Sequence, residues 1–279
     1  MANRRTDADQ IKALVERCTR DVADGLLPSC QLAIGLDGEI ILDQTIGDAQ
    51  STTRYCFFSA TKPFVAAVIW QLVSEGLVSL DAPISSFIDE FKQNGKQNIT
   101  LKQVMLHTSG FPHAPMGPKV WSNSATRRAR MAEWTLNWEP GTKYEYHPTS
   151  AHWVLAEVIT EVTGNGHADE VHRRITSPLG IPRILGLDSG EQEGIADLSL
   201  CEGEATPDEL EAVFGVREMP PSEVNDETII RFNDVDTRTV GVPGGGGYGR
   251  AADLAQFYQA LLHNQNNLWD PSLLKQATG

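Results

Sequence analysis

A serine and a lysine stand three positions apart in "FFSATKPFVAA", residues 57–67, where a long apolar run begins. Proline is tolerated in the first turn of a helix and disrupts later turns, so Pro63 predicts a helix that begins close to Ser59. Residues three apart lie on one face of a helix. A neutral Lys62 amine could take the Ser59 proton, while the helix N-terminus stabilises an oxyanion. The pair predicts a nucleophilic serine with its general base.

The spacing alone also fits a plain helix cap with a solvated lysine, because serine often caps the free N–H groups of a first turn. With 16 serines and 8 lysines in 279 residues, about 0.5 matches to S-x-x-K are expected by chance. A second match does occur, at Ser272 and Lys275. It lacks the aromatic residues and the long apolar segment that surround Ser59, so we favour Ser59 as the nucleophile.

A serine–lysine pair needs a lysine whose pKa is depressed by burial or by neighbouring groups, and a tyrosine often relays the proton to the leaving group. Tyr144 and Tyr146, in "PGTKYEYHPTSAHW", are the candidates for this relay. They precede a helix that we expect to begin near Pro148. Four tryptophans of the same region are candidates for the lining of an acyl pocket: Trp121, Trp134, Trp138 and Trp153.

Other catalytic chemistries have little support. The G-x-S-x-G motif is absent. His147/His152 and His167/His172 are five apart, which is wrong for two metal ligands on one helix face. We expect His107, in "LHTSG", to pack or to cap a turn. The run "PGGGGYGR" lacks a phosphate-loop ending and predicts a flexible turn into a helix. We therefore expect no metal and no organic cofactor.

The surrounding pattern predicts the elements that hold these residues. Residues 8–24 have the apolar spacing of an amphipathic helix, and two β-type runs flank Asp37-Gly38, a strong hairpin signal. We predict an α+β fold with an antiparallel sheet flanked by helices. Residues 1–79 and 235–279 would form its α/β portion, and residues 80–234 an inserted, mainly helical region with an acidic excursion over 188–234.

The charge and the cysteines narrow the function classes. The net charge is −14, and residues 188–234 hold 14 acidic residues against two arginines. This balance argues against a nucleic-acid partner. We see no signal peptide and no membrane-spanning run, and the four cysteines (Cys18, Cys30, Cys56 and Cys201) have the scattered spacing of free thiols. We expect a cytoplasmic protein without a membrane partner; the sequence does not predict the oligomeric state.

Four segments in order resemble the serine β-lactamase-like superfamily, which includes class C β-lactamases, D-alanyl-D-alanine carboxypeptidases and β-lactamase-like carboxylesterases. They are "FFSATKPFVAA", "LHTSGFP", "WEPGTKYEYHPTSAHWVLAEVITEVTG" and "GGGGYGRAADLAQFYQALL". The resemblance implies a β-lactamase/penicillin-binding transpeptidase-like fold and an acyl-enzyme mechanism. It further implies that Ser59 is the nucleophile, Lys62 its base and Tyr146 the tyrosine of the Tyr-x-Asn motif.

Two departures from this family shape the expected function. Tyr-x-Asn reads Tyr146-His147-Pro148, so the asparagine that holds an acylamino group is replaced. The family's third motif, with its second oxyanion donor, lies on a late strand, and the sequence stops at Gly279 before any such strand. We expect the closing strands to be missing. The favoured reading is an esterase acting on small-molecule acyl esters. The alternatives are a β-lactamase or D-alanyl-D-alanine peptidase, and a non-catalytic penicillin-binding-like protein.

Overall fold

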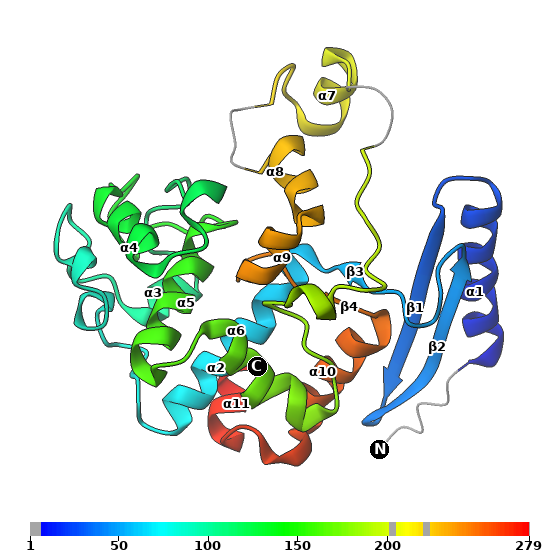
Figure 1. Ribbon diagram of the computed structural model, residues 1–279, viewed down its shortest axis with the longest axis horizontal. Helices are drawn as coiled ribbons and strands as arrows, with labels where there is room; N and C mark the ends of the chain where they lie inside the picture. The colour runs from blue at the N-terminus through cyan, green and yellow to red at the C-terminus, as the bar shows by residue number, and fades with distance from the viewer. Residues whose placement is uncertain (1–6, 201–204, 220–223, 279) are drawn as a thin grey trace.

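The computed structural model describes residues 7–200, 205–219 and 224–278 of the chain (Figure 1). Four strands are described: β1 (Ser29–Leu36), β2 (Glu39–Gly47), β3 (Tyr55–Cys56) and β4 (Tyr248–Gly249). The helices of the described residues are α1 (Ala8–Ala23), α2 (Lys62–Ser74), α3 (Leu101–Met105), α4 (Ser124–Glu133), α5 (Ser150–Thr163), α6 (His167–Val171), α7 (Pro207–Phe214), α8 (Asp226–Ile230), α9 (Val235–Val240), α10 (Ala251–His263) and α11 (Pro271–Thr278).

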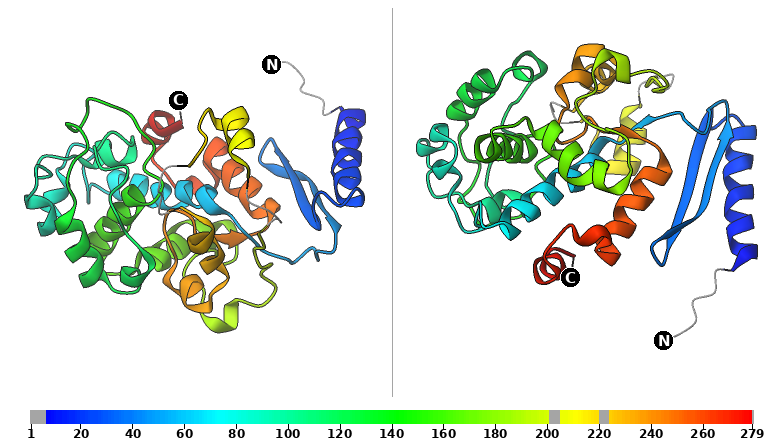
Figure 2. Two further views of the ribbon diagram at one scale, coloured as in Figure 1. Left: turned by 90° about the horizontal axis from the view of Figure 1, so that it is seen from above. Right: turned by 60° about the horizontal axis from the view of Figure 1, so that its bottom comes forward.

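The antiparallel hairpin predicted around Asp37-Gly38 is confirmed. Strands β1 and β2 pair from Ser29 opposite Gly47 to Leu36 opposite Glu39, with an irregularity between Ile34 and Gly35. Helix α1 covers one face of this hairpin and α10 the other (Figure 2). Segments from the two ends of the sequence thus pack together. The predicted α+β class is also confirmed, although the described strands form two separate two-stranded pairs.

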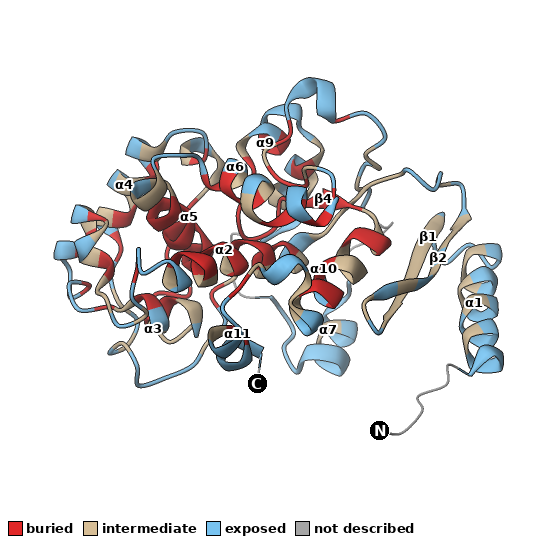
Figure 3. Ribbon diagram, turned by 90° about the horizontal axis from the view of Figure 1, so that it is seen from below, coloured by how far each residue is buried: buried red, intermediate tan, exposed pale blue. Residues whose placement is uncertain are grey.

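Helix α2 runs through the core of the molecule. Its sequence is apolar almost all round, as expected for a helix buried on every side. It packs against α5, α6 and α11, and Phe64 stacks on Phe257 of α10 with ring centroids 3.9 Å apart. Burial is concentrated in α2 and α5 and is slight in α1 (Figure 3). The element that follows Ser59 is therefore held rigidly by the rest of the protein.

The helices α2 and α5 begin within three residues of their predicted starts. The α-helix begins at Lys62, because residues Phe58–Thr61 form a 3₁₀ turn ahead of it, and no side-chain cap is present. Helix α4 ends at Glu133, where Trp134 takes an extended conformation. Helix α5 begins at Ser150, two residues after Pro148. These boundaries depend on tertiary packing, which propensity alone does not encode.

The described part of the chain contains no helix long and apolar enough to cross a membrane. Its cysteines, Cys18, Cys30 and Cys56, are free thiols, as predicted. Cys201 lies outside the described residues. Ser272, the serine of the second S-x-x-K match, donates its hydroxyl to the Asp270 carboxylate at the exposed start of α11. The same carboxylate accepts the amides of Ser272 and Leu273, so Asp270 caps α11 and the Ser272 hydroxyl is engaged in this cap.

Candidate active site

Ser59 lies in the 3₁₀ turn that joins strand β3 to helix α2. Strand β3 pairs with β4, and the Phe57 amide donates a 2.7 Å hydrogen bond to the Gly247 carbonyl, which ties the turn to the glycine loop before α10. Phe58 has a φ of 44°, in the left-handed region that bulky residues rarely adopt. A strained backbone conformation persists only where the surrounding structure holds it in place, and such residues cluster at active sites.

The structure brings the three predicted site residues together. Lys62 Nζ lies 3.2 Å from Ser59 Oγ, and the Tyr146 hydroxyl donates a 2.9 Å hydrogen bond to the same oxygen. The lysine comes from the first position of α2 and the tyrosine from the loop before α5. Tyr144, the other candidate for the relay, is largely exposed, and no contact with Ser59 is recorded for it. Ser59 Oγ is therefore bracketed by an amine and a phenol.

The Lys62 amine lies in a water-poor environment. Its side chain is buried, and burial lowers its pKa, while the neighbouring Tyr146 hydroxyl acts in the opposite direction. Nζ also donates a 2.6 Å hydrogen bond to the Gly244 carbonyl, which fixes the amine beside the serine. A lysine with a depressed pKa can exist as the neutral amine that a general base requires.

The glycine loop, residues 244–247, lies close against the site, and at Gly244 and Gly247 there is little room for a side chain. A Cβ at Gly244 would lie 3.1 Å from the Pro148 carbonyl oxygen and 3.4 Å from Lys62 Nζ. A Cβ at Gly247 would lie 2.7 Å from Thr61 Oγ1, which accepts a hydrogen bond from the Gly247 amide. The glycines let the backbone pass directly over the start of α2. The sequence predicted only a flexible turn for this run and gave no signal of its contact with Lys62.

His107 holds the backbone on both sides of Tyr146. Its carbonyl accepts a 3.2 Å hydrogen bond from the Glu145 amide, and its Nδ1 accepts a 3.2 Å bond from the His147 amide. The rings of His107 and Tyr146 are 5.0 Å apart between centroids. Burial lowers the pKa of His107 to about 4, with smaller contributions in the same direction from the neighbouring His147 and Lys62. As expected, His107 packs, but it packs against the tyrosine of the site.

His147 and His152 are also buried, and burial lowers the pKa of His147 as well. His147 Nε2 accepts a 3.2 Å bond from the Phe111 amide, and its Nδ1 lies 2.6 Å from the Glu145 carbonyl, which fixes the Nδ1–H tautomer. Burial holds the pKa of His152 well below its usual value. Within the described ranges, no three His, Cys, Asp or Glu side chains are grouped so that they could hold a metal ion.

A cavity of about 200 Å³ opens directly at Ser59. Two of the four candidate tryptophans, Trp121 and Trp153, line it, whereas Trp134 and Trp138 do not. Pro148 lines it where the family motif has asparagine. The remaining lining residues are mostly apolar: Phe58, Tyr146, Thr149, Val224, Thr228, Ile229, Phe232, Val242, Gly244 and Gly245. The serine thus faces a small apolar chamber.

The family model described as "Beta-lactamase" matches residues 11–279 of the chain. The chain belongs to the beta-lactamase family. It is a member of the β-lactamase-like serine hydrolase superfamily, as the four sequence segments indicated. Among curated proteins, it is 27% identical over 186 residues to Protein flp of Staphylococcus aureus strain MW2, covering 61% of this chain and 36% of flp. The chain thus spans little more than a third of the length of that relative.

Two solved structures share the fold over 97% of this chain and 75% of their own chains. One is a penicillin-binding protein homolog from Caulobacter crescentus, with a TM-score of 0.78 and 25% identity. The other is a family VIII carboxylesterase, with a TM-score of 0.80 and 23% identity. This fold therefore occurs both in a protein described as a penicillin-binding protein homolog and in one described as a carboxylesterase, so the fold alone does not decide the chemistry.

Proposed function

We propose that this protein is a serine hydrolase that cleaves carboxylic esters through an acyl-enzyme. The observation that carries the proposal is the position of Ser59 Oγ, within hydrogen-bond reach of Lys62 Nζ and Tyr146 Oη at the mouth of an apolar cavity. Nucleophile and base within such reach are the geometric signature of covalent catalysis. Pro148 favours an ester because it offers no side-chain donor to an acylamino group.

The reaction follows from these contacts. Neutral Lys62 accepts the Ser59 proton as Oγ attacks the carbonyl carbon, and the resulting oxyanion is stabilised by the backbone N–H of Ser59, in the turn before α2. Tyr146 passes a proton to the departing alkoxide as the bond from carbon to the alcohol oxygen breaks. The proton held by Lys62 then restores the Tyr146 hydroxyl. Water attacks the acyl carbon and gives its proton to Lys62; the bond to Ser59 Oγ breaks, Oγ takes this proton back, and the free carboxylic acid leaves.

Parallel assays of wild type and Ser59→Ala on p-nitrophenyl butyrate and on a chromogenic cephalosporin test the proposal. Ester turnover that disappears in the variant, with little lactam turnover, supports an esterase. If turnover of the cephalosporin dominates, Ser59 remains the nucleophile but the protein is a β-lactamase or peptidase. Equal rates in wild type and Ser59→Ala would show that the proposed mechanism is wrong. The cytoplasmic location and the small-molecule substrate remain predictions from the sequence.

A further inference from the structure

Two cavities meet at Trp121. The inner cavity, of about 200 Å³, is the one that Ser59 lines. The outer cavity, of about 440 Å³, has His113 and Met116 in its wall, and Ser59 does not line it. Five residues line both cavities: Trp121, Pro148, Thr149, Val224 and Thr228. A ligand that extends from Ser59 into the outer cavity therefore has to pass these shared residues, of which Trp121 has the largest side chain.

The Trp121 indole stands between the two cavities. Its ring lies 6.3 Å, centroid to centroid, from Trp153 and also 6.3 Å from Phe232, both of which line the inner cavity alone. Its Nε1 donates a 2.6 Å hydrogen bond to the carbonyl of Met116, which lines the outer cavity alone. With 4% of its surface exposed, Trp121 forms a partition between the cavities.

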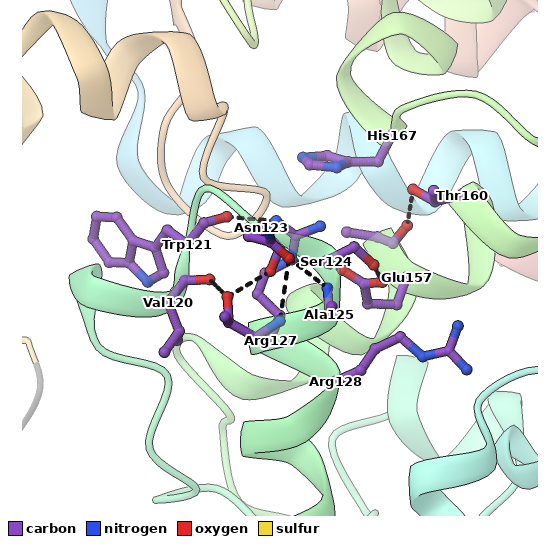
Figure 4. Close-up of polar contacts among 12 residues, drawn as sticks. Val120, Trp121, Asn123, Ser124, Ala125, Arg127, Arg128, Glu157, Thr160 and His167 are labelled. Atoms are coloured by element: carbon purple, nitrogen blue, oxygen red, sulfur yellow. Dashed lines mark hydrogen bonds and ion pairs between the residues drawn. The ribbon is translucent and has the colours of Figure 1, made fainter.

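A buried ion pair holds this partition in place (Figure 4). Arg127 donates to the Trp121 carbonyl and, at 2.6 Å, to Glu157 Oε1. Its guanidinium also lies 5.0 Å from the centre of the Trp153 ring. The second carboxylate oxygen of Glu157 accepts a hydrogen bond from Ser124. Because both charged groups are buried and hydrogen-bonded, the two tryptophans they support form a fixed wall.

The acyl group is the part of the substrate that fits the inner cavity. It stays on Ser59 while the alcohol departs past Tyr146, which is 42% exposed and so borders solvent. The lining is apolar, which favours methylene groups and disfavours a charged acyl chain. A volume of about 200 Å³ is below the range of roughly 300–1,000 Å³ that drug-sized ligands occupy. The cavity therefore suits a short, uncharged acyl chain.

We infer that Trp121 is the specificity-determining residue of this site. It limits the substrates to esters of short, uncharged carboxylic acids, and the outer cavity becomes an acyl subsite when the indole is removed. This inference rests on the proposed esterase function. It adds to that function a maximal acyl length and the residue that sets it.

The test is an acyl-length series of p-nitrophenyl esters, from acetate to decanoate, with wild type and Trp121→Leu. Wild type should prefer the short esters. In Trp121→Leu the ratio of kcat/KM for decanoate to that for butyrate should rise by at least about tenfold, since a pocket discriminates about that strongly for a methylene group it cannot hold. Most of this change should appear as a lower KM for the long ester. In a series of alkyl acetates only the alcohol varies, and Trp121→Leu should rank these esters in the same order as wild type does.

Trp134→Leu is the matched control. Trp134 is also buried, and its Nε1 also donates to a backbone carbonyl, that of Pro115 at 2.8 Å, but it lines neither cavity. The Trp134→Leu variant should have a lower free energy of unfolding and the same acyl preference as wild type. If Trp121→Leu does not fold, Trp121→Phe retains part of the wall and should give a smaller shift in the same direction.

The inference is wrong if folded Trp121 variants keep the wild-type acyl order, if Trp134→Leu shifts it equally, or if the alcohol series shifts instead. A wild-type preference for decanoate would also overturn it. Failure of the proposed function looks different, because wild type would then hydrolyse no ester of either series.

Discussion

Lys62 donates a 2.6 Å hydrogen bond to the carbonyl of Gly244, 182 residues further along the chain. This bond joins the start of the central helix α2 to the glycine loop before α10. It holds the amine at Ser59, and a Cβ at Gly244 would lie 3.1 Å from the Pro148 carbonyl oxygen, which is tighter than an ordinary contact. The Gly244 carbonyl thus positions the Lys62 amine, and burial lowers the pKa of this amine.

The pH dependence of turnover should report Lys62. Burial lowers the pKa of this amine below its usual value. The protonated form dominates below the lowered pKa and cannot act as a base, so kcat/KM should rise with pH as the amine loses its proton. Lys62→Arg, which stays protonated, should lower kcat/KM by about 10²–10⁴-fold over the whole range.

Lys96→Arg is the control for this prediction. Lys96 is also a buried lysine with a pKa lowered by burial, and its Nζ donates to the Trp134 carbonyl at 2.7 Å. The pH profile of its folded variant should match that of wild type. Lys62 is not the base if kcat/KM of wild type does not change with pH and the Lys62→Arg variant is active over the same pH range.

His107 should act on turnover through Tyr146. In His107→Ala the His147 amide loses its acceptor, and we expect kcat to fall by about tenfold, the value of one net hydrogen bond. His107→Asn should retain most of kcat, because its side-chain oxygen can accept the same bond and asparagine tolerates the left-handed conformation that His107 adopts with a φ of 56°.

Steady-state kinetics with folded variants check this pair. Because the pKa of His107 is about 4, its titration should leave no step in the pH profile near neutrality. Equal losses in the alanine and asparagine variants would indicate that the ring itself, and not the hydrogen bond, supports Tyr146.

Pro148→Asn should move the substrate preference towards lactams. Pro148 lines the cavity at Ser59, and the family's asparagine in this place holds an acylamino group. One added hydrogen bond should raise the ratio of cephalosporin to ester turnover by about tenfold. Thr149→Asn, one residue further along the same wall, controls for a simple gain of an amide in the cavity. An unchanged ratio in Pro148→Asn would mean that proline does not decide the chemistry.

The Arg127–Glu157 pair should matter for stability as a unit. Both side chains are buried, with 8% and 2% of their surfaces exposed. Glu157→Ala should lower the free energy of unfolding by about 3–5 kcal/mol, because it leaves a buried charge without a partner. Arg127→Met combined with Glu157→Met should lose much less than the sum of the single changes. Urea unfolding measures both; additive losses would contradict a coupled pair.

The sequence predicted the parts of the fold that local patterns encode. The helix of residues 8–24, the Asp37-Gly38 hairpin and the apolar helix after Ser59 all appear close to their predicted bounds. The patterns did not show the 3₁₀ turn of Phe58–Thr61 ahead of α2, which the bond from the Phe57 amide to the Gly247 carbonyl ties to a distant segment.

For the site, residue types and a family resemblance were enough to select Ser59, Lys62 and Tyr146, which the structure brings together. They were not enough to find the Gly244 carbonyl or the two hydrogen bonds of His107, because these contacts join segments far apart in sequence. The left-handed Phe58 gave no sequence signal at all, since its identity is that of an ordinary core residue.

Covalent labelling with an alkyl fluorophosphonate, followed by intact mass and peptide mapping, tests the central claim most directly. This reagent modifies nucleophilic serines irreversibly, so it does not depend on the right ester. We expect one adduct, on the peptide that contains Ser59, which is lost in Ser59→Ala and retained in Ser272→Ala, the other S-x-x-K serine. A folded wild-type protein that takes up no label on Ser59, or that is labelled equally in Ser59→Ala, would contradict the account.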